Sequence, residues 1–215
     1  VVDAEGRRYL DWNSQAMCVN HGHTPDPTIV SAVTTQMQEL AYAYPGISVV
    51  PIRAKTSALL AELVPGDINS FIYPSSGAEA NEAAMRIARL YTGRSKVLCR
   101  YRSYHGGTQA TLMASGDPRR IAAESGGGSS QIRHFFDPYP YSFQWSERPE
   151  ETAQRALDQL AEMIDCEGAH TIASIMIEPV TGSNGVLPPP PGYLEGVRAL
   201  CDEHGILLHC DEVMS

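Results

Sequence analysis

The segment Ile206-Leu-Leu-His-Cys-Asp-Glu-Val-Met-Ser215 determines how the rest of the sequence is interpreted. Its apolar residues follow Gly205 and predict a short buried strand that runs into two adjacent carboxylates, Asp211 and Glu212. Open α/β sheets bind ligands at the carboxyl ends of their strands, so these acids are candidate ligand contacts. From this segment alone they could equally be solvated loop residues, and the segments upstream decide between the two interpretations.

The upstream sequence alternates between short apolar segments and segments of helical periodicity. Besides the strand at 206–210, strands are predicted at 70–73, 96–99 and 171–177, and helices at 27–41, 51–63, 77–93, 108–115, 149–165 and 192–204. Residues 117–148 show no periodicity and are predicted to form an irregular surface excursion. Strands that alternate with helices predict an α/β fold, with a mostly parallel sheet and helices on both faces.

The composition, 43% hydrophobic and 19% charged, is that of an ordinary globular protein. A net charge of −9 without a basic tract argues against nucleic acid or an acidic membrane as a partner, because both are polyanions. No segment has the roughly 18 apolar residues of a membrane span. The five cysteines are scattered, which indicates reduced thiols in the cytoplasm or an organellar matrix. His21 and His23 lack a third ligand at suitable spacing, so no metal site is predicted.

The segment after the strand predicted at 70–73 has the features of an anion-binding helix start. Ser76 is followed three residues later by Glu79, which is the capping-box pattern, and Gly77 lets a ligand approach the backbone. The free N–H groups of Gly77 and Ala78 would face that ligand, most naturally a phosphate. Capping boxes are also common where no ligand binds, so this segment needs the support of the other strand ends.

Two more predicted strand ends carry polar side chains. Tyr104 and His105 follow the strand at 96–99, and Glu178 ends the strand at 171–177. Tyr104 and His105 alone could be packed locally in a turn. Because the carboxyl ends of parallel strands meet at one edge, these residues, the 76–78 segment and Asp211 are expected to surround one ligand with a phosphate, a flat ring and a basic nitrogen. No dinucleotide or nucleotide phosphate-loop motif follows a strand, so pyridoxal 5'-phosphate is predicted.

The sequence also contains, in order, motifs that resemble those of class III pyridoxal-phosphate aminotransferases. They are Ser76-Gly-Ala-Glu-Ala-Asn-Glu82, Tyr91-Thr-Gly-Arg94, Tyr104-His-Gly106, Glu178-Pro-Val-x-Gly182 with Gly185 and Pro188-Pro189, and Asp211-Glu-Val213. The opening residues 3–10 and the Gly22-His23 region resemble the entry to that family's large domain. The resemblance is weakest over 117–150. It implies the fold of a pyridoxal-phosphate-dependent transferase large domain.

The resemblance implies a role for each matching residue. The 76–78 segment would bind the cofactor phosphate, and Tyr104 would stack on the pyridine ring with His105 beside it. Asp211 would pair with the pyridine nitrogen, where a carboxylate favours the protonated ring. The other implied contacts are Val213 on the opposite ring face, Glu178 near the cofactor or substrate, and Met17 in the substrate pocket, where any apolar packing residue would look the same.

The sequence departs from the family at one essential position. These enzymes need a Schiff-base lysine, which in the family lies a few tens of residues beyond the Asp-Glu-Val motif. Here the only lysines are Lys55, in a predicted surface helix, and Lys96, at the start of a strand. We therefore expect a large-domain fragment, truncated at both ends and without turnover. Residues 1–50 would be an entry segment that contributes to a dimer interface, and residues 51–215 a partial cofactor-binding domain.

The activity implied by the resemblance is transfer of an amino group from an amine or amino acid to a 2-oxo acid, such as pyruvate or 2-oxoglutarate, by a homodimer. Two alternatives stay open. One is another pyridoxal-phosphate enzyme on the same scaffold, such as an aminomutase, racemase or decarboxylase. The other is a non-catalytic domain used for binding or assembly.

Overall fold

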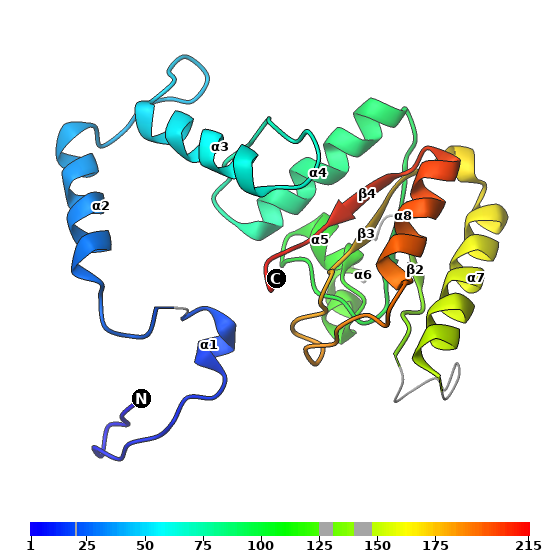
Figure 1. Cartoon of the computed structure of the whole chain (residues 1–215), viewed down its shortest axis with the longest axis horizontal. Helices are drawn as coiled ribbons and strands as arrows, with labels where there is room; N and C mark the ends of the chain where they lie inside the picture. Colours follow the sequence, from blue (N-terminus) through cyan, green and yellow to red (C-terminus); the bar gives the residue numbers. More distant parts are fainter. Residues whose placement is uncertain (20, 125–130, 140–147) are drawn as a thin grey trace. The chain divides into compact units, whose positions relative to one another are not determined.

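The computed structural model describes residues 1–19, 21–124, 131–139 and 148–215 (Figure 1). The chain divides into two compact units, Val1–Ile72 and Tyr73–Ser215. The division at residue 50 proposed from the sequence concerns functional segments and stays a prediction.

The first unit contains a small hairpin and three helices. Val2 and Arg8 form an antiparallel bridge, and the helices are α1 (Ser14–Met17), α2 (Pro27–Glu39) and α3 (Pro51–Leu63). The start of α2 is capped by Asp26, whose carboxylate accepts the N–H of Thr28 at 2.7 Å. Both predicted helices form, and no residue of α2 or α3 is buried.

The predicted strand at 70–73 is wrong, because these residues form no strand and pair with no strand of the described chain. Ile72 has 66% of its surface exposed. An apolar run of four residues predicts a strand only where a neighbouring strand accepts its backbone hydrogen bonds.

The second unit is built on a four-stranded sheet. The strands are β1 (Lys96–Arg100), β2 (Ile132–Phe135), β3 (Ile172–Ile177) and β4 (Leu207–Cys210), in the order β2-β1-β3-β4. All three pairings are parallel, which confirms the predicted fold class. Every residue of β3 is buried, as expected for a central parallel strand covered on both faces.

Strand β2 corrects the interpretation of 117–148 as wholly irregular. It is a four-residue edge strand whose first and last residues, Ile132 and Phe135, are buried, while Arg133 and His134 lie between them. A strand this short with a polar centre has no apolar run by which it could be recognised. The same region also contains the short helices η1 (Pro118–Arg120) and α6 (Ile121–Glu124).

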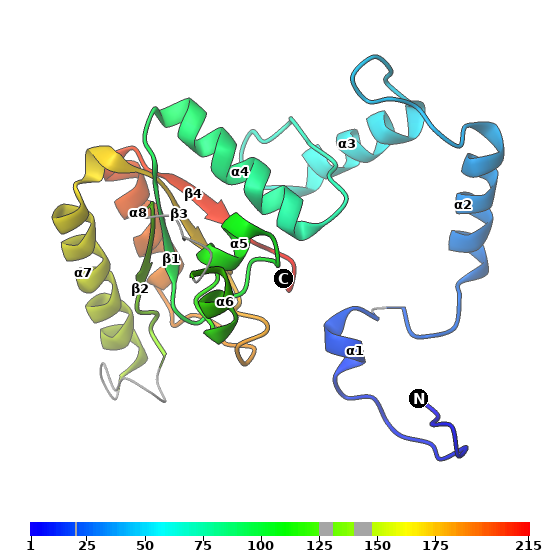
Figure 2. The same cartoon turned by 180° about the vertical axis from the view of Figure 1, so that it is seen from behind.

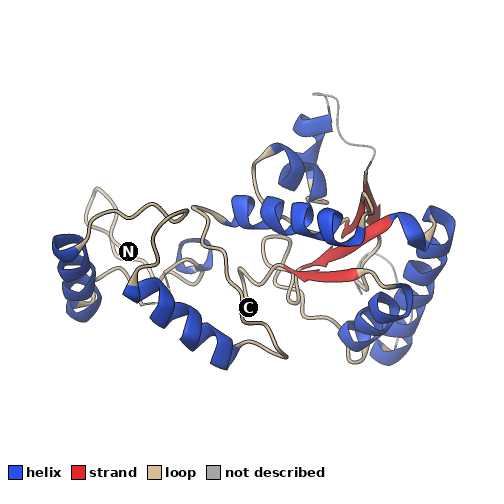
Figure 3. Ribbon diagram, turned by 90° about the horizontal axis from the view of Figure 1, so that it is seen from above, coloured by secondary structure: helices blue, strands red, loops and turns tan. Residues whose placement is uncertain are grey.

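Helices cover both faces of this sheet (Figures 2 and 3). On one face, α4 (Gly77–Thr92) and α5 (Gln109–Ala114) pack over a core formed by Met85, Val97, Cys99, Met113, Ala114, Ile132 and Met176. On the other, α7 (Pro149–Glu167) and α8 (Tyr193–His204) bury a larger core that includes Leu98, Leu160, Ile164, Ile175, Ile177 and Val197. Neighbouring residues of β1 thus enter opposite cores, as the alternation of side chains along a strand requires. The short helix η2 (Ala169–Thr171) leads into β3.

The side of α4 that faces the sheet is not its most apolar one. Ile87 and Tyr91, which recur at helical spacing, are 47% and 81% exposed. The buried residues are Asn81, Met85 and Ala88, which recur at the same helical spacing one step around the helix. A polar residue therefore lies on the buried side of α4, next to the carboxyl edge of the sheet.

Two further expectations concern the whole chain. In the described ranges, no helix is long and apolar enough to cross a membrane. All five cysteines are free thiols, as predicted from their spacing.

Candidate functional site

A cavity of about 280 Å³ lies at the carboxyl edge of the sheet in the second unit. It is formed by the first turn of α4, the loop after β1 and the residues after β4. Its walls are Gly77, Ala78, Asn81, Tyr104, His105, Gly106, Gly107, Asp211 and Val213. Most of the residues predicted from separate strand ends are therefore brought together around one space.

The first turn of α4 presents free backbone donors to this cavity. Ser76 caps the helix, because its hydroxyl accepts the N–H of Glu79 at 3.3 Å, and Glu79 accepts the N–H of Ser75 at 2.7 Å. A Cβ placed on Gly77 would meet no atom within 4 Å, so the space in front of the helix is open there. This helix start, with its positive dipole end, is suited to an anionic group.

Asp211 is held rigidly at the opposite side of the cavity. Its N–H donates to the carbonyl of Ile177 at 2.8 Å, which extends the pairing of β4 with β3 by one residue. Its Oδ2 accepts from Asn81 Nδ2 at 2.8 Å and from His105 Nδ1 at 2.9 Å. Burial alone would raise the pKa of Asp211, but the hydrogen bonds from His105 and then Asn81 outweigh it and lower the pKa below its ordinary value. Asp211 is therefore a carboxylate at neutral pH.

Asn81 links the elements that meet at Asp211. Its amide nitrogen donates both to Asp211 and to the carbonyl of His105, the latter at 2.9 Å. Both partners are acceptors, so the amide oxygen must face His209, whose Nε2 lies 3.1 Å away and donates to it. Asn81 was not predicted as a site residue. A signal existed, because Asn81 shares the i, i+4, i+7 spacing of Met85 and Ala88.

His209, which was also not predicted, is a partly buried neutral imidazole beside Asn81. Burial, followed by the nearby imidazole of His105, lowers the pKa of His209 from 6.5 to about 4. Between these values the unfolded chain binds more protons than the folded protein, so the free energy of unfolding should decrease as the pH falls from 6.5 towards 4, by up to about 3 kcal/mol. Urea unfolding at pH 7.5, 6.5, 5.5 and 4.5 measures this decrease.

The matched variant for that experiment is His209→Gln, which keeps an N–H donor near Asn81 but does not titrate. We expect a smaller decrease in unfolding free energy for this variant over the same pH range. The pKa of Asp211 is lowered from its ordinary value of 3.8. Protonation of Asp211 therefore changes the unfolding free energy below pH 3.8, outside the pH range of this experiment. An identical pH dependence in both proteins would show that His209 is not the group responsible.

Tyr104 forms another wall of the cavity, and Arg119 packs on its ring with the guanidinium carbon 3.8 Å from the ring centroid. Arg119 is held in turn by Asp117, with Nε to Oδ2 at 2.8 Å. Arg119 was not recognised in the sequence, since nothing in the local pattern distinguishes it from a solvated surface arginine.

Glu178 does not line the cavity. It is 1% exposed. Its carboxylate connects two loops, because it accepts the N–H of Tyr104 at 3.0 Å and the N–H of Gly182 at 2.7 Å. Ser76 likewise lies just outside the lining. The predicted contact of Glu178 with cofactor or substrate stays a prediction, and the geometry favours an indirect role through the backbone of Tyr104.

The remaining candidates lie elsewhere. The backbone of Met17 ends α1, but its side chain is outside the described residues, so its place in a substrate pocket stays a prediction. Lys96 is at the amino end of β1, where its Nζ bonds the carbonyl of Glu167 at 2.7 Å and pairs with the Glu167 carboxylate at 2.6 Å. Lys55 lies in α3 of the first unit. Among the described residues, no group of three or more metal-binding side chains is present.

The cavity offers three kinds of contact at once. The start of α4 can bind an anion, the ring of Tyr104 can stack on a flat group, and the Asp211 carboxylate can pair with a protonated ring nitrogen. His105 and Asn81 occupy Oδ2 of Asp211, and among the described residues Oδ1 accepts only the N–H of Val213, at 3.4 Å. This donor and acceptor set matches the predicted pyridoxal phosphate.

Comparisons with known proteins show which family this chain belongs to. The family described as Aminotransferase class-III matches residues 1–215. The hypotaurine/taurine–pyruvate aminotransferase of Paracoccus denitrificans is 36% identical over 99% of this chain and 46% of its own length. The isoleucine 2-epimerase of Lentilactobacillus buchneri is 30% identical over 99% of this chain and 48% of its own length. The solved structure of taurine:2-oxoglutarate aminotransferase from Bifidobacterium kashiwanohense, in complex with PLP and glutamate, has a TM-score of 0.91 and 38% identity, covering 99% of this chain and 48% of that one. The chain thus spans about half the length of the relatives that it matches.

Proposed function

Since this chain belongs to the class-III aminotransferase family, we propose that it forms the cofactor-binding part of an enzyme that transfers an amino group from an amine or amino acid to a 2-oxo acid. The observation that carries the proposal is the Asp211 carboxylate, held by His105 and Asn81 across one cavity from the first turn of α4. Structural relatives, one of them solved with PLP and glutamate, support the same cofactor class.

Bound pyridoxal phosphate supplies an electron sink for chemistry at the substrate carbon that bears the amino group. In our proposal Asp211 keeps a proton on the ring nitrogen of the cofactor, because an ionised carboxylate stabilises the protonated form. The N–H groups of Gly77 and Ala78, with the hydroxyl of Ser76 close by, bind the phosphate. Tyr104 and Val213 pack against the ring, and Glu178 positions Tyr104 through its backbone N–H.

The hydrogen bonds around Asp211 would keep it ionised and correctly aimed. His105 is fully buried and Asp211 almost so, with side-chain exposures of 0% and 10%. In such surroundings water screens the charge less than at the surface, so the carboxylate acts more strongly on a ring nitrogen. Asn81 adds a second donor and ties Asp211 to α4, so both ends of the cofactor would be positioned by one helix.

We further propose that the lysine that binds the cofactor covalently lies outside these 215 residues. Two facts support this. The chain spans about half of the length of its relatives, and Lys96 is committed to Glu167 at the opposite end of β1 from the cavity. The 215 residues alone would then bind the cofactor weakly and without turnover. Dimer formation, with residues 1–50 contributing to the interface, and a cytoplasmic or organellar location stay predictions.

The test is to purify the full-length protein that contains these residues and add pyridoxal phosphate. We expect visible absorbance from bound cofactor, and formation of alanine from pyruvate or glutamate from 2-oxoglutarate with a panel of amine donors that includes taurine. The same measurements on residues 1–215 alone should show weak binding and no product. A full-length protein that binds no cofactor would contradict the proposal and favour a binding or assembly domain.

A second candidate function is amino-acid epimerisation, which the isoleucine 2-epimerase relative at 30% identity favours. Chiral analysis of the product separates the two functions. An epimerase changes the configuration of its amino acid without a 2-oxo acid acceptor, whereas an aminotransferase requires the acceptor.

A further inference from the structure

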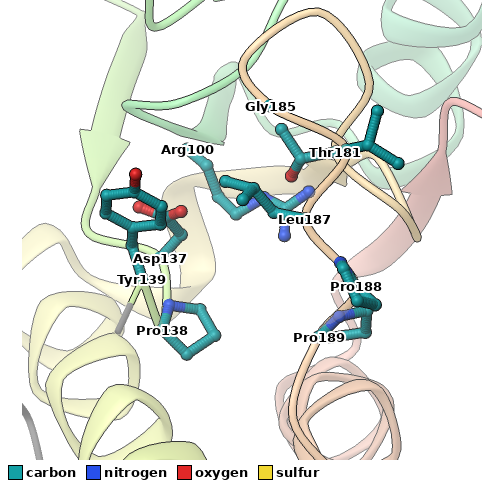
Figure 4. Close-up of a pocket in the computed structure, with 10 residues that line it drawn as sticks. Arg100, Asp137, Pro138, Tyr139, Thr181, Gly185, Leu187, Pro188 and Pro189 are labelled. Carbon is teal, nitrogen blue, oxygen red and sulfur yellow. The ribbon is translucent and has the colours of Figure 1, made fainter. Parts of the chain in front are cut away.

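A second cavity, of about 290 Å³, opens at the carboxyl edge of the same sheet (Figure 4). It lies between the end of β1, the residues that follow β2 and the loop that follows β3. The lining residues are Arg100, Asp137, Pro138, Tyr139, Thr181, Gly185, Val186, Leu187, Pro188 and Pro189. None of them lines the cavity that contains Asp211, so the two spaces are separate sites.

The cavity is preformed by backbone bonds in the loop. Thr181 donates its N–H to the carbonyl of Leu187 at 3.1 Å, and Leu187 donates to the carbonyl of Thr181 at 2.9 Å. The turn between them includes Gly185 with a φ of +131°, a conformation that residues with a side chain rarely adopt. The wall formed by Leu187, Pro188 and Pro189 is therefore held in place without a ligand.

Arg100 enters this cavity as a buried cation with little compensation. It is 3% exposed, and one guanidinium N–H donates to the main-chain carbonyl of Glu178. Its Nε has no hydrogen-bond partner, and in the described part of the chain no carboxylate forms an ion pair with it. Burying a guanidinium without an anionic partner is costly, so an anion that reaches it gains a strong charge-assisted hydrogen bond. Figure 4 shows Arg100 extending between the 137–139 segment and the 181–189 loop.

The carboxylates nearby are already engaged. Asp137 forms an ion pair with Arg102, in which Nη2 lies 2.8 Å from Oδ1 and Nε donates to Oδ2 at 3.2 Å. The guanidinium carbon of Arg102 also lies 4.4 Å from the ring centroid of Tyr139. Both carboxylate oxygens of Glu178 accept hydrogen bonds from backbone N–H groups, one from Tyr104 and one from Gly182. Tyr193, whose pKa is raised to about 12 by burial, stays neutral and cannot balance the charge of Arg100.

We propose that this second cavity binds a small organic carboxylate. Its carboxylate group pairs with Arg100, and its apolar body packs against Pro138, Leu187, Pro188 and Pro189. A charged group at one end and a proline-rich wall at the other select an acid with a short hydrocarbon or aromatic body over a phosphate or a sugar acid. The site has no lining residue in common with the cofactor cavity, and the proposal does not rest on the proposed amino-group transfer.

The experiment is calorimetric titration of the full-length protein, saturated with pyridoxal phosphate, with benzoate and with its neutral isostere benzamide. We expect benzoate to bind at least tenfold more tightly, because only benzoate can pair with Arg100. Equal affinities for the two compounds, or no heat from benzoate at tens of millimolar, would overturn the proposal. The readout is binding alone, so it stands even if the protein proves not to be an aminotransferase.

Two variants locate the bound benzoate. Leu187→Trp fills the cavity and leaves Arg100 in place, and Arg100→Met removes the charge; each should weaken benzoate at least tenfold. Arg198→Gln, which removes an exposed arginine paired with Asp202 on α8, is the charge-matched control and should bind benzoate unchanged. If Arg100→Met fails to fold, Leu187→Trp and the benzamide comparison still decide. Unchanged binding to Leu187→Trp would place benzoate elsewhere and refute the site.

Discussion

Replacing Asp211 by asparagine in the full-length enzyme should lower kcat/KM for amino-group transfer by about 10²- to 10³-fold, which corresponds to about 3 to 4 kcal/mol. Asparagine has nearly the same shape but no charge, so it cannot hold the proton on the ring nitrogen of the cofactor. It would also present an amide N–H₂ to Asn81 and His105, which both donate to Asp211 in the native protein. Cofactor affinity should fall together with the rate, and a spectroscopic titration with pyridoxal phosphate measures it.

The matched control is Glu212→Gln, which removes the same charge from the adjacent residue. Glu212 is exposed and does not line the cavity, so we expect less than a twofold change in both quantities. This variant separates a local effect of Asp211 from a general loss of negative charge at the end of β4. Equal losses in the two variants would contradict the role assigned to Asp211.

Replacing Gly106 by alanine should abolish tight cofactor binding and destabilise the second unit by about 2 to 4 kcal/mol. The φ of Gly106 is +135°, which is unfavourable for any residue with a side chain. A Cβ at this position would lie 2.7 Å from the Cβ of Ala78, 2.7 Å from Oγ1 of Thr111 and 2.9 Å from the Cα of Ala78. The first turn of α4 would have to move away, and that turn is the proposed phosphate site. Urea unfolding and cofactor titration measure the two effects.

Gly107→Ala is the control for this prediction. A Cβ on Gly107 would meet only the hydroxyl of Tyr104, at 3.9 Å, and Gly107 has no positive φ. We expect a change in unfolding free energy of less than about 1 kcal/mol. A tolerated Gly106→Ala, or equal damage from both variants, would show that close packing of this loop on α4 is not what shapes the site.

Much of the second unit followed from local patterns. Ser76 and Glu79 indicated the start of α4, and Gly93 and Gly205 indicated the ends of α4 and α8, because capping depends on residues within one turn. Strands β1, β3 and β4 were recognisable as apolar runs beside turn residues, although β4 is only partly buried. Strand β2 was not, because a four-residue edge strand is defined by the partner it pairs with.

The candidate site also contains some residues that local sequence predicted and others that only the folded structure shows. Polar residues at the ends of parallel strands predicted Tyr104, His105 and Asp211 as neighbours, and the structure brings them to one cavity. Asn81 and His209 escaped notice, although Asn81 donates to a carboxylate 130 positions away in the sequence. Glu178 was placed at the right edge of the sheet, but its carboxylate points into the backbone of two loops.

Local sequence established the helices with their caps, the parallel α/β fold and the chemical types that meet at the carboxyl edge, because each depends on residues a few positions apart. Tertiary packing established which side of α4 is buried, how Asn81 connects His209 to Asp211, and that Arg100 lines a second cavity. Such properties depend on distances between residues far apart in the chain. The Ile206–Ser215 segment illustrates both cases. Its strand and its two acids can be recognised in the sequence. The ionisation and orientation of Asp211 depend on hydrogen bonds from Asn81 on α4 and His105 in the loop after β1.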